Sequence, residues 1–229
     1  MSDLCAAIAA MVDHSLLDPT LTDEALDEGC NVARRLKVAS VCIKPYAVKR
    51  CAGILEGSGV RPSTVIGFPH GSHSTSAKVA EARIALDDGA GELDMVVNIG
   101  KVLSRDWDYV RSEIAAVVAE AHARGGLVKV IFENCYLTDY HKERLCEMSG
   151  EAGADFIKTS TGFGPGGATL HDLKLMLEHA PPGVKVKAAG GIRTLDQLLE
   201  VRNLGVARVG ASRTEEILQE CRRRFGAGQ

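Results

Sequence analysis

The chain alternates short apolar runs, rich in β-branched residues, with longer stretches whose apolar residues recur at helical spacing. The apolar runs predict eight strands, over residues 11–16, 39–43, 63–68, 92–98, 127–133, 155–159, 184–188 and 207–210. The stretches between them predict helices over residues 22–36, 76–88, 107–124, 139–152, 170–179, 195–204 and 212–225. We also expect a short helix ahead of the first strand.

Local signals mark where several of these helices begin and end. Thr22, Thr138 and Thr194 each stand just before a helical stretch, where a threonine hydroxyl can accept a hydrogen bond from a free backbone N–H. Gly89 and Gly125 follow two other stretches, as glycines that close helices do. The boundaries are therefore indicated by local chemistry as well as by periodicity.

Strands and helices alternate at intervals of roughly 20–35 residues, which is the pattern of a parallel sheet. An open nucleotide-binding sheet would carry G-x-G-x-x-G directly after its first strand, and this chain does not. Its 229 residues match the size of a one-domain barrel, and no linker or low-complexity tract divides them. We predict an α/β fold, a single (β/α)8 TIM barrel in which residues 1–229 form one catalytic domain.

Composition narrows the classes of partner. Hydrophobic residues make up 45% and charged residues 25% of the chain, which is ordinary for a globular protein. The net charge of −3 leaves no basic excess for a nucleic-acid backbone, so we expect no nucleic-acid partner. No uncharged apolar stretch approaches the roughly 20 residues that cross a bilayer, so we expect no membrane partner.

The N-terminal segment and the cysteines indicate the compartment. The N-terminal segment lacks a basic region, and Asp13 and His14 interrupt its apolar run, so we do not expect a signal peptide. The seven cysteines are odd in number, scattered and without a C-x-x-C pair, which favours reduced thiols over a disulfide framework. We expect a cytoplasmic protein.

A lysine stands late in the apolar strand predicted at 155–159. Lys158 is followed by Thr-Ser-Thr-Gly, in which Thr161 and Gly162 are candidate contacts to a ligand. The lysine could extend its amine to solvent or pair with a buried acid. A desolvated amine inside a barrel would instead favour its neutral form, the form that attacks a carbonyl. This interpretation makes Lys158 a candidate nucleophile.

Charged residues also occur in two other strands. Lys185 and Lys187 alternate onto one face of the strand at 184–188, with Lys187 nearer the catalytic end. A second ammonium beside Lys158 would further lower the pKa of its amine by repulsion. Asp94 could relay protons between the lysines or merely neutralise them. The combination favours catalysis over packing.

Glycine-containing loops follow the last two predicted strands. Gly190-Gly191 and Gly210-Ala211-Ser212 each precede a helical stretch. Helix N-termini with close backbone approach bind phosphate, and barrels often place this site after strands seven and eight. These loops are therefore candidate phosphate contacts.

Other polar residues carry weaker signals. His70 and His73 lack the spacing and the further ligands of a zinc site, so we expect no metal. Cys42 stands late in the strand at 39–43 and can face the barrel interior, although buried cysteines usually act as small hydrophobic residues. Cys42 is kept as a candidate contact to substrate.

Seven segments resemble the deoxyribose-phosphate aldolase family, class I aldolases that act through a Schiff base. The resemblance extends from Asp13 to Ser212 and is most specific in Phe-Ile-Lys-Thr-Ser-Thr-Gly at 156–162 together with Lys-Ala-Ala-Gly-Gly-Ile-Arg at 187–193. The other matching segments are Val-Asp-His-Ser-Leu-Leu at 12–17, Ser-Val-Cys-Ile-Lys-Pro at 40–45, Val-Ile-Gly-Phe-Pro-His-Gly at 65–71, Glu-Leu-Asp-Met-Val-Val-Asn at 92–98 and Gly-Ala-Ser at 210–212.

The resemblance implies roles for individual residues. Lys158 would form the Schiff base, and Asp94 and Lys187 would relay protons. Asp13 and Ser15 would lie near the substrate hydroxyls. Substrate contacts are expected at Asp13, Ser15, Cys42, Thr161, Gly162, Gly190, Gly191, Gly210 and Ser212, of which Gly190, Gly191 and Ser212 would bind phosphate.

The implied reaction is the reversible cleavage of 2-deoxy-D-ribose 5-phosphate to D-glyceraldehyde 3-phosphate and acetaldehyde, in deoxyribonucleotide catabolism and without a cofactor. The implied partners are small-molecule sugar phosphates and aldehydes, and further copies of the chain in a dimer or tetramer. Phe163 stands where some members carry a phosphate-binding lysine, which implies weaker phosphate affinity. The tail at 225–229 has no terminal tyrosine, which some members use in proton exchange.

Three alternatives stay open at this point. One is another Schiff-base aldolase of the same fold that takes a related sugar phosphate, such as a ketose bisphosphate. A second is a barrel that binds a sugar phosphate without catalysis. A third is a metal-free isomerase at the same phosphate site, which would need no imine.

Overall fold

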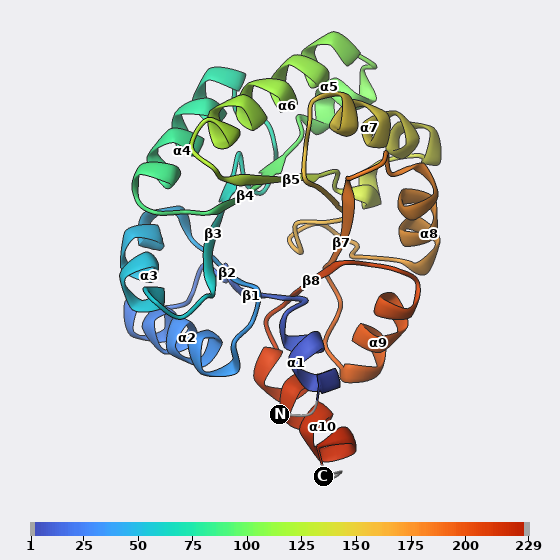
Figure 1. Ribbon diagram of the computed structural model, residues 1–229. Coiled ribbons are helices and arrows are strands. Elements are labelled where there is room, and N and C mark those ends of the chain that lie inside the picture. The colour runs from blue at the N-terminus through green and yellow to red at the C-terminus, as the bar shows by residue number, and fades with distance from the viewer. Residues whose placement is uncertain (1–2, 227–229) are drawn as a thin grey trace.

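The computed structural model describes residues 3–226 and contains a closed barrel of eight parallel strands, in which β8 pairs with β1. The strands are β1 (Val12–Leu16), β2 (Ser40–Ile43), β3 (Arg61–Ile66), β4 (Glu92–Val96), β5 (Leu127–Ile131), β6 (Phe156–Lys158), β7 (Lys185–Ala189) and β8 (Arg208–Ala211). Figure 1 looks into the barrel and shows helices in a ring around it. The predicted TIM barrel is confirmed.

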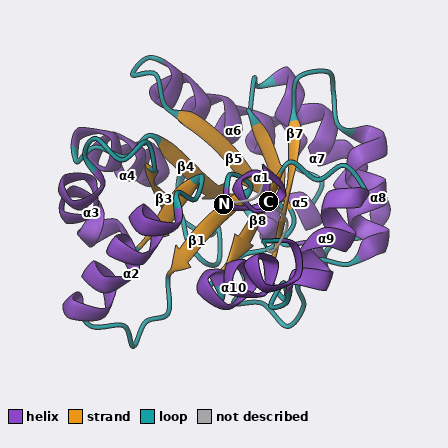
Figure 2. Ribbon diagram, turned by 60° about the horizontal axis from the view of Figure 1, so that its bottom comes forward, coloured by secondary structure: helices purple, strands orange, loops and turns teal. Residues whose placement is uncertain are grey.

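Helices follow the strands and cover the outside of the barrel, as Figure 2 shows from a second direction. They are α1 (Asp3–Ala9), α2 (Asp23–Leu36), α3 (Val48–Leu55), α4 (Thr75–Asp87), α5 (Ile99–Leu103), α6 (Trp107–His122), α7 (Asp139–Glu151), α8 (Leu170–His179), α9 (Leu195–Asn203) and α10 (Thr214–Phe225), with 3-10 helices η1 (Pro45–Ala47) and η2 (Asn134–Tyr136). Helix α1 is the expected N-terminal helix. None of the helices between residues 3 and 226 is long and apolar enough to cross a bilayer.

Alternation along β4 divides its side chains between two environments. Leu93 and Met95 belong to the apolar core, and burying a side chain of this size stabilises the fold by about 1.5–3 kcal/mol. Glu92 and Asp94 contact charged residues of other strands inside the barrel. All five residues of β4 are buried, so the charged inner face must be satisfied by protein partners.

The predicted helix starts are confirmed by their capping contacts. The hydroxyls of Thr22 and Thr194 accept hydrogen bonds from backbone N–H groups three residues further on. Thr138 forms a capping box with His141 at the start of α7. Each such cap contributes about 1 kcal/mol to helix stability. The corresponding helices begin within one residue of their predicted positions.

Two helices were not expected from the sequence. Helix α3 has eight residues and contains Gly53, which lowers its helix propensity. Helix α5 has five residues, which is too short for a helical period to show. Asn98, expected in the fourth strand, instead caps α5 by accepting a hydrogen bond from the N–H of Lys101 at 3.1 Å.

Cys5 in α1 and Cys221 in α10 form a disulfide, with Cα atoms 5.9 Å apart. The prediction of reduced thiols is therefore wrong for this pair. The two positions are 216 residues apart in the sequence, and only closure of the barrel brings α1 alongside α10 at the bottom of Figure 1. The free cysteines among the described residues are Cys30, Cys42, Cys51, Cys135 and Cys146.

Candidate active site

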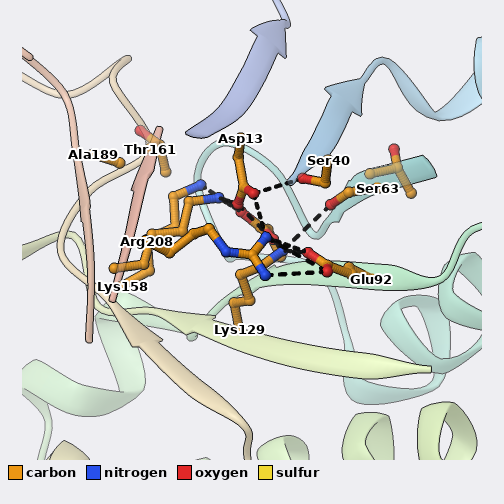
Figure 3. A network of polar contacts seen from close by, with 12 residues as sticks. Asp13, Ser40, Ser63, Glu92, Lys129, Lys158, Thr161, Ala189 and Arg208 are labelled. Carbon is orange, nitrogen blue, oxygen red and sulfur yellow. Dashed lines mark hydrogen bonds and ion pairs between the residues drawn. The ribbon is translucent and has the colours of Figure 1, made fainter. Parts of the chain in front are cut away.

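Seven charged side chains from six strands meet inside the barrel, and Figure 3 shows several of them pointing toward one another. We call this set the barrel charge network: Asp13 from β1, Glu92 and Asp94 from β4, Lys129 from β5, Lys158 from β6, Lys187 from β7 and Arg208 from β8. The side chain of Arg208 is 14% exposed, and the other six are at most 4% exposed. The network is therefore almost free of solvent screening.

Asp94 lies at the centre of the network. Its Oδ2 accepts hydrogen bonds from Nζ of Lys158 at 2.8 Å and from Nζ of Lys187 at 2.7 Å. Its Oδ1 accepts from Nζ of Lys129 at 2.7 Å. Strand pairing aligns these groups, since Asp94 is in register with Lys129, and Lys158 with Lys187. One carboxylate thus joins amines from three consecutive strands.

Glu92, Arg208 and Asp13 complete the network. Oε2 of Glu92 is 2.6 Å from Nζ of Lys129 and 3.1 Å from Nη1 of Arg208. The carboxylate of Asp13 bonds both Arg208 and Lys187. Each charged group therefore has at least one partner of opposite charge, as burial requires.

The network holds four basic groups and three acids, so complete ionisation would leave one uncompensated positive charge. A buried unpaired charge costs several kcal/mol, which favours loss of one proton. Burial lowers the pKa of the Lys158 amine, Asp94 opposes that effect, and Lys187 lowers the pKa further. Among the four basic groups, Lys158 alone has a lowered pKa. Its causes, burial and the ammonium of Lys187, are the two that the sequence led us to expect.

The pKa shifts of Lys129, Lys187 and Asp94 favour the charged forms of these groups. Burial alone would lower the pKa of Lys129 and of Lys187, but the carboxylates of Asp13 and Asp94 outweigh it and raise both. Burial works to raise the pKa of Asp94, yet the three lysines hold it well below its usual range. With Lys158 neutral, three cations face three carboxylates, and the buried charges balance.

Lys158 and Lys187 border a cavity of about 570 Å³ at the carboxyl ends of the strands. The cavity lining includes all nine expected substrate contacts: Asp13, Ser15, Cys42, Thr161, Gly162, Gly190, Gly191, Gly210 and Ser212. Asp94 is fully buried and bonds the two lysines. The structure therefore brings together every residue that the sequence marked as a candidate.

Comparison with known proteins decides the family. Residues 7–212 match the family model described as DeoC/LacD family aldolase. The chain belongs to this family. It is therefore an aldolase, and the resemblance found in the sequence is confirmed.

Individual relatives cover nearly the whole aldolase. A deoxyribose-phosphate aldolase of Rhodopirellula baltica is 58% identical over 96% of this chain and 91% of its own length. A deoxyribose-phosphate aldolase of Thermococcus kodakarensis is 48% identical over 93% of this chain and 96% of its own length. The solved structure of a tetrameric deoxyribose phosphate aldolase from Aeropyrum pernix matches with a TM-score of 0.89 at 31% identity, covering 96% of this chain and 93% of that chain.

The helix after the Gly190-Gly191 loop begins where it was predicted, and the helix after Ser212 begins two residues later than predicted. Gly190 and Gly191 have φ of 81° and 89°, a left-handed backbone that favours glycine. Helix α9 begins only at Leu195, after the cap residue Thr194. Helix α10 begins two residues after Ser212. Both loops line the cavity, but neither is the first turn of a helix.

Glu133, just after β5, is a functional candidate that the sequence pattern did not single out. Its φ of 59° is left-handed, which costs a residue with a side chain about 1–2 kcal/mol. Its buried carboxylate accepts hydrogen bonds from the backbone N–H of Thr161 at 3.2 Å and from the hydroxyl of Thr161. That hydroxyl oxygen accepts from the N–H of Phe163 at 3.0 Å. Glu133 thus anchors the loop that leads from β6 into the cavity.

The β6–α8 loop also contacts the loop after β7. Phe163 lines the cavity and packs edge to face on Phe68, with ring centroids 5.3 Å apart. The N–H of Ala168 donates to the carbonyl oxygen of Gly190 at 3.0 Å. A Cβ atom on Gly167 would lie 2.4 Å from that same oxygen. The close approach of the two glycines therefore couples the two loops.

The C-terminal tail, which has no terminal tyrosine, ends in three residues that lie outside the described part of the chain.

Glu92, Lys129 and Arg208 are the members of the network that sequence reasoning missed. The signal was present, because Glu92 alternates with Asp94 and Lys129 stands in the middle of an apolar run. Lys185, by contrast, is exposed at the start of β7, where its Nζ lies 5.7 Å from the ring centroid of Phe156.

One group of side chains that could hold a metal lies outside the barrel. Among residues 3–226 it consists of Asp139, His171 and Asp172, on α7 and α8. Nζ of Lys142 is 3.1 Å from Asp139 and also bonds Asp172. The ammonium of Lys142 therefore already pairs with both of these acids.

Proposed function

We propose that this aldolase reversibly cleaves 2-deoxy-D-ribose 5-phosphate to D-glyceraldehyde 3-phosphate and acetaldehyde through a Schiff base on Lys158. One observation carries the proposal: Lys158 borders the cavity, and burial lowers the pKa of its amine. A neutral amine adds to a carbonyl, and an ammonium does not. The choice of substrate rests on the relatives named deoxyribose-phosphate aldolase, one of them 58% identical.

The first step is formation of the imine. Nζ of Lys158 attacks C1 of the open-chain sugar, and the carbinolamine that results loses its hydroxyl group as water. Lys187 donates the proton for this departure. The positive charge that appears on the iminium of Lys158 replaces the charge that Lys187 gives up, so the barrel charge network stays balanced throughout.

The second step breaks the C2–C3 bond. The amine of Lys187, now neutral, accepts the proton of the C3 hydroxyl, while Asp94 bonds both lysines and keeps them in place. The electron pair of the C2–C3 bond moves toward the iminium, which leaves an enamine, and glyceraldehyde 3-phosphate departs. Lys187 returns the proton to C2. Water then hydrolyses the new iminium to acetaldehyde and the free amine of Lys158, and the proton that this releases restores the ammonium of Lys187.

The cavity lining suggests how the sugar lies. We place the phosphate at Gly190, Gly191 and Ser212, because backbone N–H groups in left-handed loops form concave sites for anions. Asp13 and Ser15 line the same cavity and would contact the sugar hydroxyls. The remaining contacts would come from Cys42, Thr161, Gly162 and Gly210.

The proposed chemistry needs no metal or other cofactor. The iminium withdraws electrons from the breaking bond, which is the task that a metal ion performs as a Lewis acid in other aldolases. Turnover in excess EDTA should therefore equal turnover without it. A loss of activity that added zinc restores would contradict the scheme.

A comparison of substrates tests the proposal. Cleavage of 2-deoxyribose 5-phosphate and of a ketose bisphosphate is measured under the same conditions with a coupled assay for the released triose phosphate. We expect the larger kcat/KM for deoxyribose phosphate. Preference for the bisphosphate would move the assignment to another aldolase of the family, and cleavage of neither sugar would support a barrel that only binds.

We also propose that residues 1–229 work as one catalytic domain within a cytoplasmic homo-oligomer. The relative from Aeropyrum pernix is described as tetrameric, which supports assembly. Light scattering after size-exclusion chromatography should give a multiple of 24.4 kDa. A single species at the monomer mass would contradict this part of the proposal.

A further inference from the structure

Lys129 and Glu92 are among the members of the barrel charge network that lie outside the lining of the cavity. The side chains of Lys129 and Glu92 are 0% and 1% exposed. The lining of the cavity includes Lys158 and Lys187 but neither of these two. Yet Lys129 shares the carboxylate of Asp94 with both cavity lysines. An effect of Lys129 or Glu92 on the reaction would therefore have to act through Asp94.

We propose that Lys129 and Glu92 are positioning residues that decide the protonation state of Lys158, because they set the charge balance around Asp94 and the direction of its hydrogen bonds. The inference rests on the proposed Schiff-base chemistry of Lys158. It adds two residues to that chemistry, neither of which touches the substrate.

The balance of charge is the first support. The network contains one more basic group than acid, so one amine must be neutral for the buried charges to match. Removal of Lys129 would make the two numbers equal, and Lys158 could then keep its proton. Removal of Glu92 would widen the excess of basic groups, and Lys158 would lose its proton more readily. Burial makes such differences large, since water does not screen them.

The hydrogen bonds of Asp94 predict the same effects of the two substitutions on the protonation of Lys158. Lys129 occupies Oδ1, while Lys158 and Lys187 share Oδ2. Without Lys129, the carboxylate would interact more strongly with the two cavity lysines and favour an ammonium at Lys158. Without Glu92, Lys129 would interact more strongly with the carboxylate of Asp94. Asp94 would then stabilise an ammonium at Lys158 less.

Within the described part of the chain, no further ionised group acts on the amine of Lys158, so the count of basic and acidic groups in the network is unchanged. Its amine is influenced by Asp94 from β4, Lys187 from β7 and Cys42 from β2. Burial raises the pKa of the Cys42 thiol, so this group is neutral and does not enter the charge balance. Other strands of the barrel place further polar groups nearby. They are Asp13 from β1, Arg208 from β8 and the uncharged Ser63 from β3, whose hydroxyl oxygen is 3.5 Å from Nζ of Lys129.

The test is the pH dependence of imine formation in Lys129→Met, in Glu92→Gln and in the double variant. Acetaldehyde and cyanoborohydride trap the imine, and mass spectrometry measures the rate at which the peptide of Lys158 is labelled. We expect the midpoint of the pH profile to move up by about one pH unit in Lys129→Met and down by a similar amount in Glu92→Gln. The double variant removes one charge of each sign, so its midpoint should return to the wild-type value.

Controls separate this effect from damage to the fold. Lys185→Met removes an exposed lysine from β7, and its midpoint should not move. Thermal unfolding shows which variants are folded, and the double variant leaves neither member of the pair buried without a partner. If Lys129→Met does not fold, the downward shift in Glu92→Gln and its reversal in the double variant decide the matter.

Two results would refute the proposal. Midpoints that stay at the wild-type value, or that move in the same direction in both single variants, would show that Lys129 and Glu92 only support the fold. Absence of any label on Lys158 in the wild-type protein would instead refute the proposed Schiff base, and the inference with it.

Discussion

Lys158 and Lys187 are paired in register on β6 and β7, and their amines bond the same oxygen atom, Oδ2 of Asp94. The pKa values of the two amines nevertheless shift in opposite directions. Lys187 also bonds Asp13, and the two carboxylates raise its pKa against the effect of burial. Burial lowers the pKa of Lys158, which Asp94 only partly offsets. The second carboxylate thus suits Lys187 to the proposed role of acid and leaves Lys158 suited to the proposed role of nucleophile.

Replacement of Lys187 by leucine should abolish most turnover. The substitution removes the proposed acid and base, and it also removes the positive charge that helps to keep Lys158 neutral. We expect kcat for deoxyribose 5-phosphate cleavage to fall by about 100-fold or more. The matched control is Lys185→Leu on the same strand, which should retain wild-type turnover. Near-normal turnover in Lys187→Leu would show that its assigned role is wrong.

Loss of the Glu133 carboxylate should weaken substrate binding. In Glu133→Ala the N–H of Thr161 loses its buried acceptor, at a cost of about 1–3 kcal/mol, and the β6–α8 loop loses its anchor. We expect KM to rise several-fold, with a smaller change in kcat. Glu133→Gly lacks the carboxylate as well but tolerates the left-handed backbone, so it should show the same KM with less loss of stability. Wild-type KM in both variants would contradict the anchoring role.

Gly167→Ala should disturb the contact between the loops after β6 and β7. The added methyl group would meet the carbonyl oxygen of Gly190 at 2.4 Å, so the glycine pair at the proposed phosphate site must shift. We expect KM for the sugar phosphate to rise about 10-fold or more, which corresponds to about 1.4 kcal/mol. In Gly53→Ala the new methyl group meets open space in α3, so KM should not change. An equal KM in both variants would refute the coupling of the loops.

His14 should make the fold sensitive to acid. Its Nδ1 lies 2.8 Å from Oγ1 of Thr214, and burial lowers its pKa to about 4. An unfolded histidine has a pKa of about 6.5. The neutral ring is therefore favoured in the folded state, so its contribution is complete above pH 6.5 and is lost as the pH falls toward 4. The loss should reach about 3 kcal/mol.

Urea unfolding at a series of pH values measures this contribution. The wild-type protein should lose stability between pH 6.5 and 4 more steeply than His14→Gln, whose side chain does not titrate. Carboxylates that titrate in the same range affect both proteins equally. Parallel curves for the two proteins would contradict the role of His14.

The fold could be predicted because its determinants are local. Most strands lie in short runs rich in β-branched and other apolar residues, and several helices carry a threonine cap that marks their start. Helices α3 and α5 were missed because they are only eight and five residues long, although the buried residues Val48, Cys51 and Leu55 of α3 do recur at helical spacing. The disulfide between Cys5 and Cys221 depends on the meeting of the first and last helices, which spacing along the chain does not report.

The site could be predicted only in part for a related reason. Lys158, Lys187 and Asp94 stand out as charges late in apolar strands, and the family segments mark them as well. Lys129 is likewise a charged residue within an apolar strand. That Glu92 and Asp94 are its partners follows only from the register between β4 and β5, which the sequence pattern does not report. The role of Glu133 depends on its backbone conformation and on a loop contact, and the alternation of apolar residues encodes neither.

Borohydride trapping with acetaldehyde tests the Schiff base at Lys158 most directly. The protein is reduced in the presence of acetaldehyde, digested and mapped by mass spectrometry, with Lys158→Ala treated in parallel. We predict a reduced two-carbon adduct on the peptide that contains Lys158, and no adduct at the active site of the variant. An adduct on Lys187 in place of Lys158 would contradict the assignment of the nucleophile. No adduct on any lysine, with cleavage activity intact, would contradict the imine mechanism itself.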